Sequence, residues 1–123
     1  MSAIAQTNTY KLNHISLFQN DALFHEGTLN VVFKVDEDIK KIESILPDGR
    51  HLVEKILSKE KAEGESNTIR YTASARSQNG KRTTYGYYFI DKFNRQITFA
   101  SISVNKEAKG IKQNLKNYIV YQY

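Results

Sequence analysis

Residues 68–76, TIRYTASAR, and residues 82–90, RTTYGYYFI, are two runs rich in β-branched and aromatic residues, and Gln78-Asn79-Gly80 lies between them. Asn-Gly accepts the positive φ angles that tight hairpin turns require, so the two runs are predicted to form an antiparallel hairpin. A third run, residues 95–104, RQITFASISV, follows the short loop 91–94 and is predicted to extend the sheet. This unit decides the fold class.

The apolar positions of the third run change phase. The apolar pattern includes Phe99 and then resumes at Ile102, one position out of step. An extra residue in one strand of an antiparallel pair produces such a shift. We therefore predict a β-bulge or bend near Ala100 and Ser101.

Two earlier segments also carry strand patterns. Residues 10–18, YKLNHISLF, are aromatic and branched, and they lead into the polar turn Gln19-Asn20-Asp21. Between Thr28 and Val35, apolar and polar residues alternate with the period of two that is typical of a half-buried strand. Both segments are predicted to be strands.

Residues 36–65 fit two alternatives. The acidic run Asp36 to Asp38 precedes apolar residues at helical spacing, which favours a helix that starts there. Pro47-Asp48-Gly49 is a strong turn signal and favours a pair of strands instead. The pattern leaves both open, and residues 60–67 are predicted to be a charged loop.

The C-terminal segment has the spacing of a helix. Asn105 is a residue that caps helices, and Ala108, Ile111, Leu115 and Tyr118 recur every three or four positions. The predicted fold is therefore α+β, an antiparallel sheet followed by a C-terminal helix. A chain of 123 residues fits a single domain, residues 1–123.

Composition and motifs exclude several classes of function. The chain has no cysteine, so disulfides and thiolate chemistry are excluded. No segment resembles a signal peptide or a membrane span, so we expect a protein that is not exported and does not contact a membrane. His14, His25 and His51 match no metal or catalytic spacing and are predicted to be structural. We expect no enzyme activity, no cofactor and no metal.

Charge is distributed unevenly along the chain. Residues 1–66 carry 8 Lys or Arg and 11 Asp or Glu, whereas residues 67–123 carry 10 and 2, respectively. A basic surface attracts polyanions because Lys and Arg replace the counterions that phosphates condense. The C-terminal half is thus a candidate surface for nucleic acid, and a solvated basic face without a ligand is the alternative.

One strand concentrates groups that bind RNA. Successive side chains of a strand point to opposite faces, so Arg70, Thr72, Ser74 and Arg76 share one face. Arginine makes forked hydrogen bonds to phosphate or guanine, and hydroxyl groups suit unpaired bases. An ordinary solvent-exposed face is the alternative explanation.

The neighbouring strands are predicted to extend this surface. Asn94, Gln96 and Thr98 share one face of the third strand, and Tyr88 of the second strand is a candidate for stacking on a base. Tyrosines in such strands are also common in cores and subunit interfaces. The predicted RNA-binding residues are Arg70, Thr72, Ser74, Arg76, Tyr88, Asn94, Gln96 and Thr98.

The segments RYTASAR, SQNGKRTT, the strand from Tyr85, ITFASISV and the predicted helix from Lys106 together resemble the coat proteins of single-stranded RNA bacteriophages. The resemblance covers about residues 68–117. It implies a homodimer with paired sheets that assembles into an icosahedral capsid around genomic RNA. It also implies that the sheet binds an operator hairpin, with Asn94 as the best match to a hairpin contact. The expected location is the virion, assembled in the bacterial cytoplasm.

Two further classes of protein fit the same features. The first is a monomeric module, such as an OB-like or cold-shock-like barrel, that binds single-stranded nucleic acid through the same charges and tyrosines. The second is an inhibitor or immunity protein whose basic half recognises an acidic protein surface. Particle size and salt-sensitive RNA binding discriminate among the three.

Overall fold

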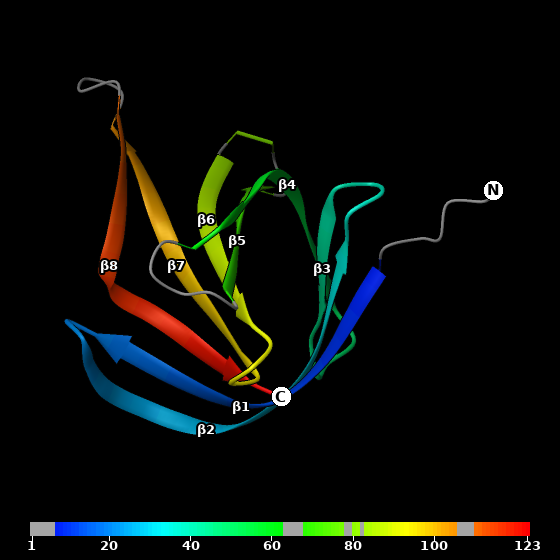
Figure 1. The fold of residues 1–123 in the computed structure, drawn as a ribbon, viewed down its shortest axis with the longest axis vertical. Coiled ribbons are helices and arrows are strands. Elements are labelled where there is room, and N and C mark those ends of the chain that lie inside the picture. The colour runs from blue at the N-terminus through cyan, green and yellow to red at the C-terminus, as the bar shows by residue number, and fades with distance from the viewer. Residues whose placement is uncertain (1–6, 63–67, 78–79, 82, 106–109) are drawn as a thin grey trace.

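The computed structural model describes residues 7–62, 68–77, 80–81, 83–105 and 110–123, with the backbone alone for 103–105 and 110–116. Consecutive strands pair antiparallel, and the last strand pairs with the first to close a barrel of eight strands (Figure 1). The strands are β1 (Thr7–Gln19), β2 (Ala22–Asp36), β3 (Lys41–Ile45), β4 (His51–Lys61), β5 (Thr68–Arg76), β6 (Thr83–Asp91), β7 (Gln96–Asn105) and β8 (Gly110–Gln122).

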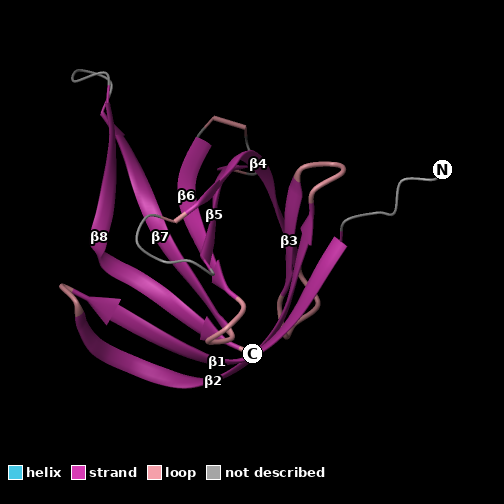
Figure 2. Ribbon diagram, viewed as in Figure 1, coloured by secondary structure: helices cyan, strands magenta, loops and turns pink. Residues whose placement is uncertain are grey.

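The predicted α+β fold is wrong, because the described residues form strands and no helix (Figure 2). β8 occupies most of the segment predicted to be the C-terminal helix, and the predicted helix start at 106–109 lies outside the described residues. β8 pairs with β7 along one edge and with β1 along the other. The ladder with β7 pairs residues 110–113 and 118–122 of β8, and the ladder with β1 pairs 118–122, so long-range pairing overrides the helical spacing of its apolar residues.

Several local predictions are confirmed. Of the segment 36–65, the described residues 36–62 form the strand pair, with β3 and β4 joined by the turn at Pro47-Asp48-Gly49, where Gly49 has a φ of 88°. Asn20 and Asp21 turn between β1 and β2 with φ angles of 52° and 61°. β5 and β6 form the predicted hairpin, although residues 78 and 79 of its turn lie outside the described part. The predicted irregularity in β7 is a register shift against β8 between Ala100 and Ile102.

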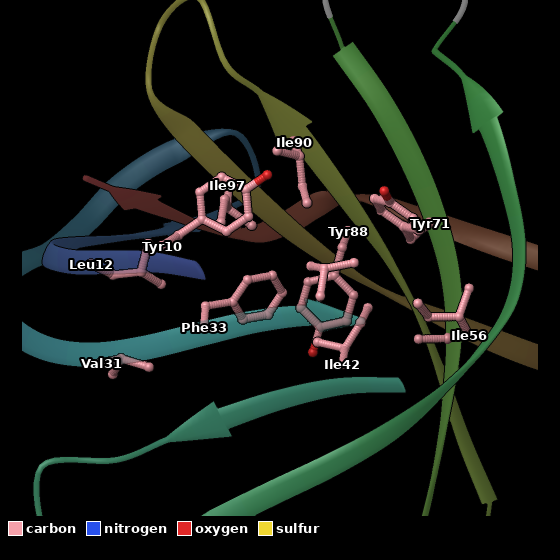
Figure 3. Packing of buried hydrophobic residues seen from close by; sticks show 12 residues of the cluster. Tyr10, Leu12, Val31, Phe33, Ile42, Ile56, Tyr71, Tyr88, Ile90 and Ile97 are labelled. Carbon is pink, nitrogen blue, oxygen red and sulfur yellow. The ribbon is translucent and has the colours of Figure 1, made fainter. Parts of the chain in front are cut away.

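The core fills the inside of the barrel. The inward-facing residues alternate along each strand with outward-facing ones, as the geometry of a closed barrel requires. Figure 3 shows the aromatic rings and branched side chains of this cluster converging from different strands. Its members are Tyr10, Leu12, Val31, Phe33, Val35, Ile42, Ile56, Tyr71, Ala73, Tyr88, Ile90 and Ile97.

Candidate functional site

The two ends of the barrel are filled to different degrees. Near the turns that join β2 to β3 and β6 to β7, the core residues Val35 and Ile97 are completely buried. At the opposite end, Leu52 is 51% exposed although it shares the inward face of β4 with buried Ile56. Ser101 is also exposed there, although it pairs with Gly86 on the inner wall. We call this second end the open end.

The open end exists because the strands have unequal lengths. β3 has 5 residues, whereas β1 has 13 and β2 has 15. β3 pairs only with Val32–Asp36 of β2, so within the described chain the preceding residues of β2 have no partner on that edge. The β1–β2 hairpin therefore extends beyond its neighbour, and the wall of the barrel is low at β3 and β4.

Glu54 lies on the inner wall close to this rim. It stands two residues after Leu52 on the inward face of β4 and pairs across the sheet with buried Ile42. The hydroxyl of Tyr88 donates a hydrogen bond to Oε2 of Glu54. Burial raises the pKa of Glu54, and the hydrogen bond from Tyr88 only partly opposes that effect. The carboxyl group is thus partly withdrawn from water.

Aromatic rings surround the partner of Glu54. The ring of Tyr88 lies 5.3 Å from that of Phe33 and 4.9 Å from that of Phe99, measured between centroids. Phe99 lies directly over Gly86, which has no side chain to displace it. Burial also raises the pKa of Tyr121, and the nearby charge of Glu54 adds to that rise. Glu54 therefore borders an interior rich in aromatic rings.

A pocket of about 280 Å³ opens beside Phe99, between the projecting hairpins. It includes polar atoms of Ser101 and Asn117, but most of its lining is apolar. Its remaining lining residues are Leu17, Phe18, Phe24, Tyr118 and Ile119. Phe99 lines the pocket and contacts Tyr88, so these two rings lie between the pocket and the carboxylate of Glu54, which is not itself part of the lining.

A second polar cluster lies at the opposite end of the barrel. Oε1 of Glu37 accepts hydrogen bonds of 2.6 Å from both Nζ of Lys59 and the hydroxyl of Tyr71. These bonds hold the pKa of Glu37 below its ordinary value. A pocket of about 290 Å³, which also includes Lys40 and Ile56, adjoins the cluster. The charge of Glu37 is balanced by Lys59, so the cluster has a structural explanation.

The predicted RNA-binding strand is β5, and its polar row faces outward. Arg70, Thr72 and Ser74 are half-buried on the outer wall, while Tyr71 between them points into the core. The guanidinium of Arg70 pairs with Glu60 at 2.5 Å and lies 4.6 Å from the ring centroid of Tyr87. Arg70 is therefore already neutralised, which removes part of the basis for the RNA prediction.

The structure separates the other predicted residues. Tyr88 points into the barrel, so its predicted place on the polar face is wrong, and the adjacent Tyr87 occupies that face. Asn94 lies in the turn after β6, where its side-chain nitrogen donates to Asp91 at 2.7 Å. Gln96 and Thr98 are half-buried on the outer wall of β7, and Arg76 is exposed at the end of β5.

Binding of single-stranded RNA, dimerisation, capsid assembly and location in the virion stay predictions, as do the resemblance to phage coat proteins and the absence of enzyme activity. The sheet-and-helix architecture from which the capsid prediction was drawn is replaced by a barrel. The row of Arg70, Phe89 and Thr98 does cross three neighbouring strands on the outer wall. Tyr85, Tyr87 and Phe89 are aromatic residues that this surface offers in place of Tyr88.

Two of the histidines and several acidic residues have partners within the protein. His51 bonds Glu43 at 2.6 Å and His14 lies 3.7 Å from Glu26, which agrees with structural roles for these two. Asp36 ends β2 and does not start a helix; its Oδ1 accepts from the backbone amides of Asp38 and Ile39 in the turn that leads to β3. Within the described ranges, no group of three or more potential ligands could hold a metal ion, and no helix is long and apolar enough to cross a membrane.

The fold defines the class of protein: an up-and-down, antiparallel, closed barrel of eight strands, here with a carboxyl group on its inner wall. No protein family, curated protein or solved structure matches the chain. The function of the site is therefore inferred from its own residues.

Sequence reasoning missed Glu54 although a signal was present. In the strand alternative for residues 36–65, Leu52, Glu54 and Ile56 share one face. A carboxylate between two apolar residues on the inward phase is rarely placed there unless it has a partner. That signal was hidden because the segment fitted a helix equally well.

Proposed function

We propose that the protein binds a small organic ligand, without chemistry, in the open end of its barrel. An eight-stranded barrel has an interior that side chains fill or that holds one small ligand. The observation that carries the proposal is Glu54, a partly buried carboxylate on the inner wall near the open end, where the described side chain of Leu52 is 51% exposed. Binding sites commonly combine an apolar lining with a few placed polar groups, and the pocket beside Phe99 has that character.

The size of the pocket limits the ligand. A volume of about 280 Å³ lies at the lower end of the range for ligand sites, which is roughly 300–1,000 Å³. The apolar lining favours a compact aromatic or aliphatic body rather than a sugar or a nucleotide. Phe24 is 60% exposed at the edge of this pocket and is a side chain that such a body would cover.

A neutral fluorescent probe tests this proposal. N-phenyl-1-naphthylamine is expected to bind saturably, with enhanced emission, because its rings would leave water for the pocket. Phe24→Ser should weaken binding by roughly fivefold to tenfold, since apolar contact area is lost. Phe93→Ser is the matched control, because Phe93 is 79% exposed in the turn between β6 and β7, away from the pocket. Absence of saturable binding, or equal weakening by both variants, would contradict the proposal.

A further inference from the structure

Glu54 is set apart by being partly buried with no cationic partner among the described residues. Asp36 and Asp91 also lack a cation among these residues, but each accepts from backbone amides in an exposed turn. Five carboxylates lie within 4 Å of a basic nitrogen: Glu26, Glu37, Glu43, Asp48 and Glu60. Among the described residues, no such ion pair includes Glu54, and its one hydrogen-bond donor is the neutral hydroxyl of Tyr88. A carboxylate that leaves water without a cation is costly to ionise.

The groups around Glu54 suit a positive charge. The faces of aromatic rings carry negative potential, and an organic cation is attracted to them at distances up to about 6 Å. Among the described residues, Tyr88 supplies the ring that contacts Glu54, and Phe33 and Phe99 pack against that ring. An ammonium group there could pair with the carboxylate and lie beside the ring of Tyr88.

Glu54 is half-buried and not fully enclosed. Leu52, on the same face of β4 and nearer the rim, is 51% exposed, and the neighbouring strand β3 is short. A ligand that enters from the open end passes this rim before it meets the filled part of the core. The pocket beside Phe99 provides room for an apolar body at the same end.

We propose that the ligand of the open end is an organic amine with an aromatic or aliphatic body, whose ammonium group pairs with Glu54 and lies against the ring of Tyr88. This inference rests on the proposed function and names the chemical class of its ligand. The ammonium group supplies the cation that Glu54 lacks, and the apolar body occupies the pocket lined by Phe99. A neutral ligand of the same shape fills the pocket but leaves the carboxylate unpaired.

Two probes of one shape separate the charge from the apolar body. We expect 2-(1-naphthyl)ethylammonium to bind at pH 7 about 10-fold to 100-fold more tightly than 2-(1-naphthyl)ethanol, as for hydrogen bonds to charged groups. Glu54→Gln keeps the shape of the side chain and should reduce this preference to about one. Glu43→Gln is the matched control, because the substitution removes the same charge from the outward face of β3. Glu43 is the chain neighbour of Ile42, whose side chain points inward. Glu43→Gln should retain the preference.

The outcomes distinguish failure of the amine inference from failure of the proposed function. Equal binding of amine and alcohol, or an amine preference that survives Glu54→Gln, overturns the amine inference and leaves the proposed function standing. Binding of neither probe overturns both. If Glu54→Gln does not fold by circular dichroism, Glu54→Asp replaces it, because the shorter side chain withdraws the carboxylate from the amine. An unchanged preference in Glu54→Asp would then contradict the inference.

Discussion

Replacing Phe33 with alanine is expected to lower the free energy of unfolding by about 3–5 kcal/mol, as for large aromatic residues in cores. Phe33 is 2% exposed, and its ring contacts those of Tyr10 and Tyr88 at centroid distances of 6.3 and 5.3 Å. Truncation removes both contacts and leaves a cavity at the centre of the barrel. A loss of this size is a large part of the roughly 5–15 kcal/mol that stabilises a typical domain. Urea unfolding followed by tyrosine fluorescence measures it.

Phe93 provides the matched control for this substitution. Its side chain is 79% exposed in the turn between β6 and β7, so Phe93→Ala should change the free energy of unfolding by less than about 0.5 kcal/mol. The two variants remove the same atoms from opposite environments. Similar urea midpoints for both would show that Phe33 does not lie inside the barrel.

Replacing either of two strand glycines with alanine is expected to change the free energy of unfolding, downward at Gly86 and upward at Gly27. A Cβ atom at Gly86 would lie 2.8 Å from Cζ of Phe99 and closer still to Cε2, so the ring must move. Gly86→Ala should therefore cost about 1–3 kcal/mol, the usual penalty for overpacking. A Cβ atom at Gly27 would have Nε2 of His25 at 3.9 Å as its nearest neighbour. Gly27→Ala should add about 0.4–1 kcal/mol, because it restricts the unfolded chain.

Thermal unfolding by circular dichroism measures both signs in one experiment. The melting temperature should fall for Gly86→Ala and rise for Gly27→Ala. A rise for both would mean that Phe99 does not cover Gly86 and that the inner wall of β6 and β7 is packed differently. A fall for both would mean that Gly27 does not have the room that the structure gives it.

The strands could be predicted from the sequence where the alternation was unbroken. The pairs β5–β6 and β6–β7 follow from turn chemistry and a period of two, and these signals are local. The row of Arg70, Thr72 and Ser74 was correctly placed on one face. Tyr88 was assigned to the wrong face. Tyr87 and Tyr88 are adjacent residues of the same type, and only the register of β6 against β5 decides which of them points inward.

Closure of the barrel could not be predicted, because it depends on contacts between the two ends of the chain. β1 and β8 pair from Phe18 against Tyr118 to His14 against Gln122. No local pattern in either strand specifies that partner. The residues of β8 also satisfy a helical spacing, so without the partner the local pattern predicted a helix. The site was missed for a local reason, since residues 36–65 fitted a helix as well as a strand pair and Glu54 was therefore not assigned to an inward face.

The titration of Glu54 tests the central claim most directly. The carboxyl carbon of Glu54, followed by NMR in the intact protein without ligand, should titrate with a midpoint above the ordinary value of 4.5, because burial disfavours the charged form. A raised pKa means that the folded chain holds this proton more tightly than the unfolded chain. Stability should therefore fall as pH rises from 4.5 through the folded pKa, and Glu54→Gln should remove that loss. A midpoint at or below 4.5 would show a solvated or paired carboxylate and would contradict a binding site inside the barrel.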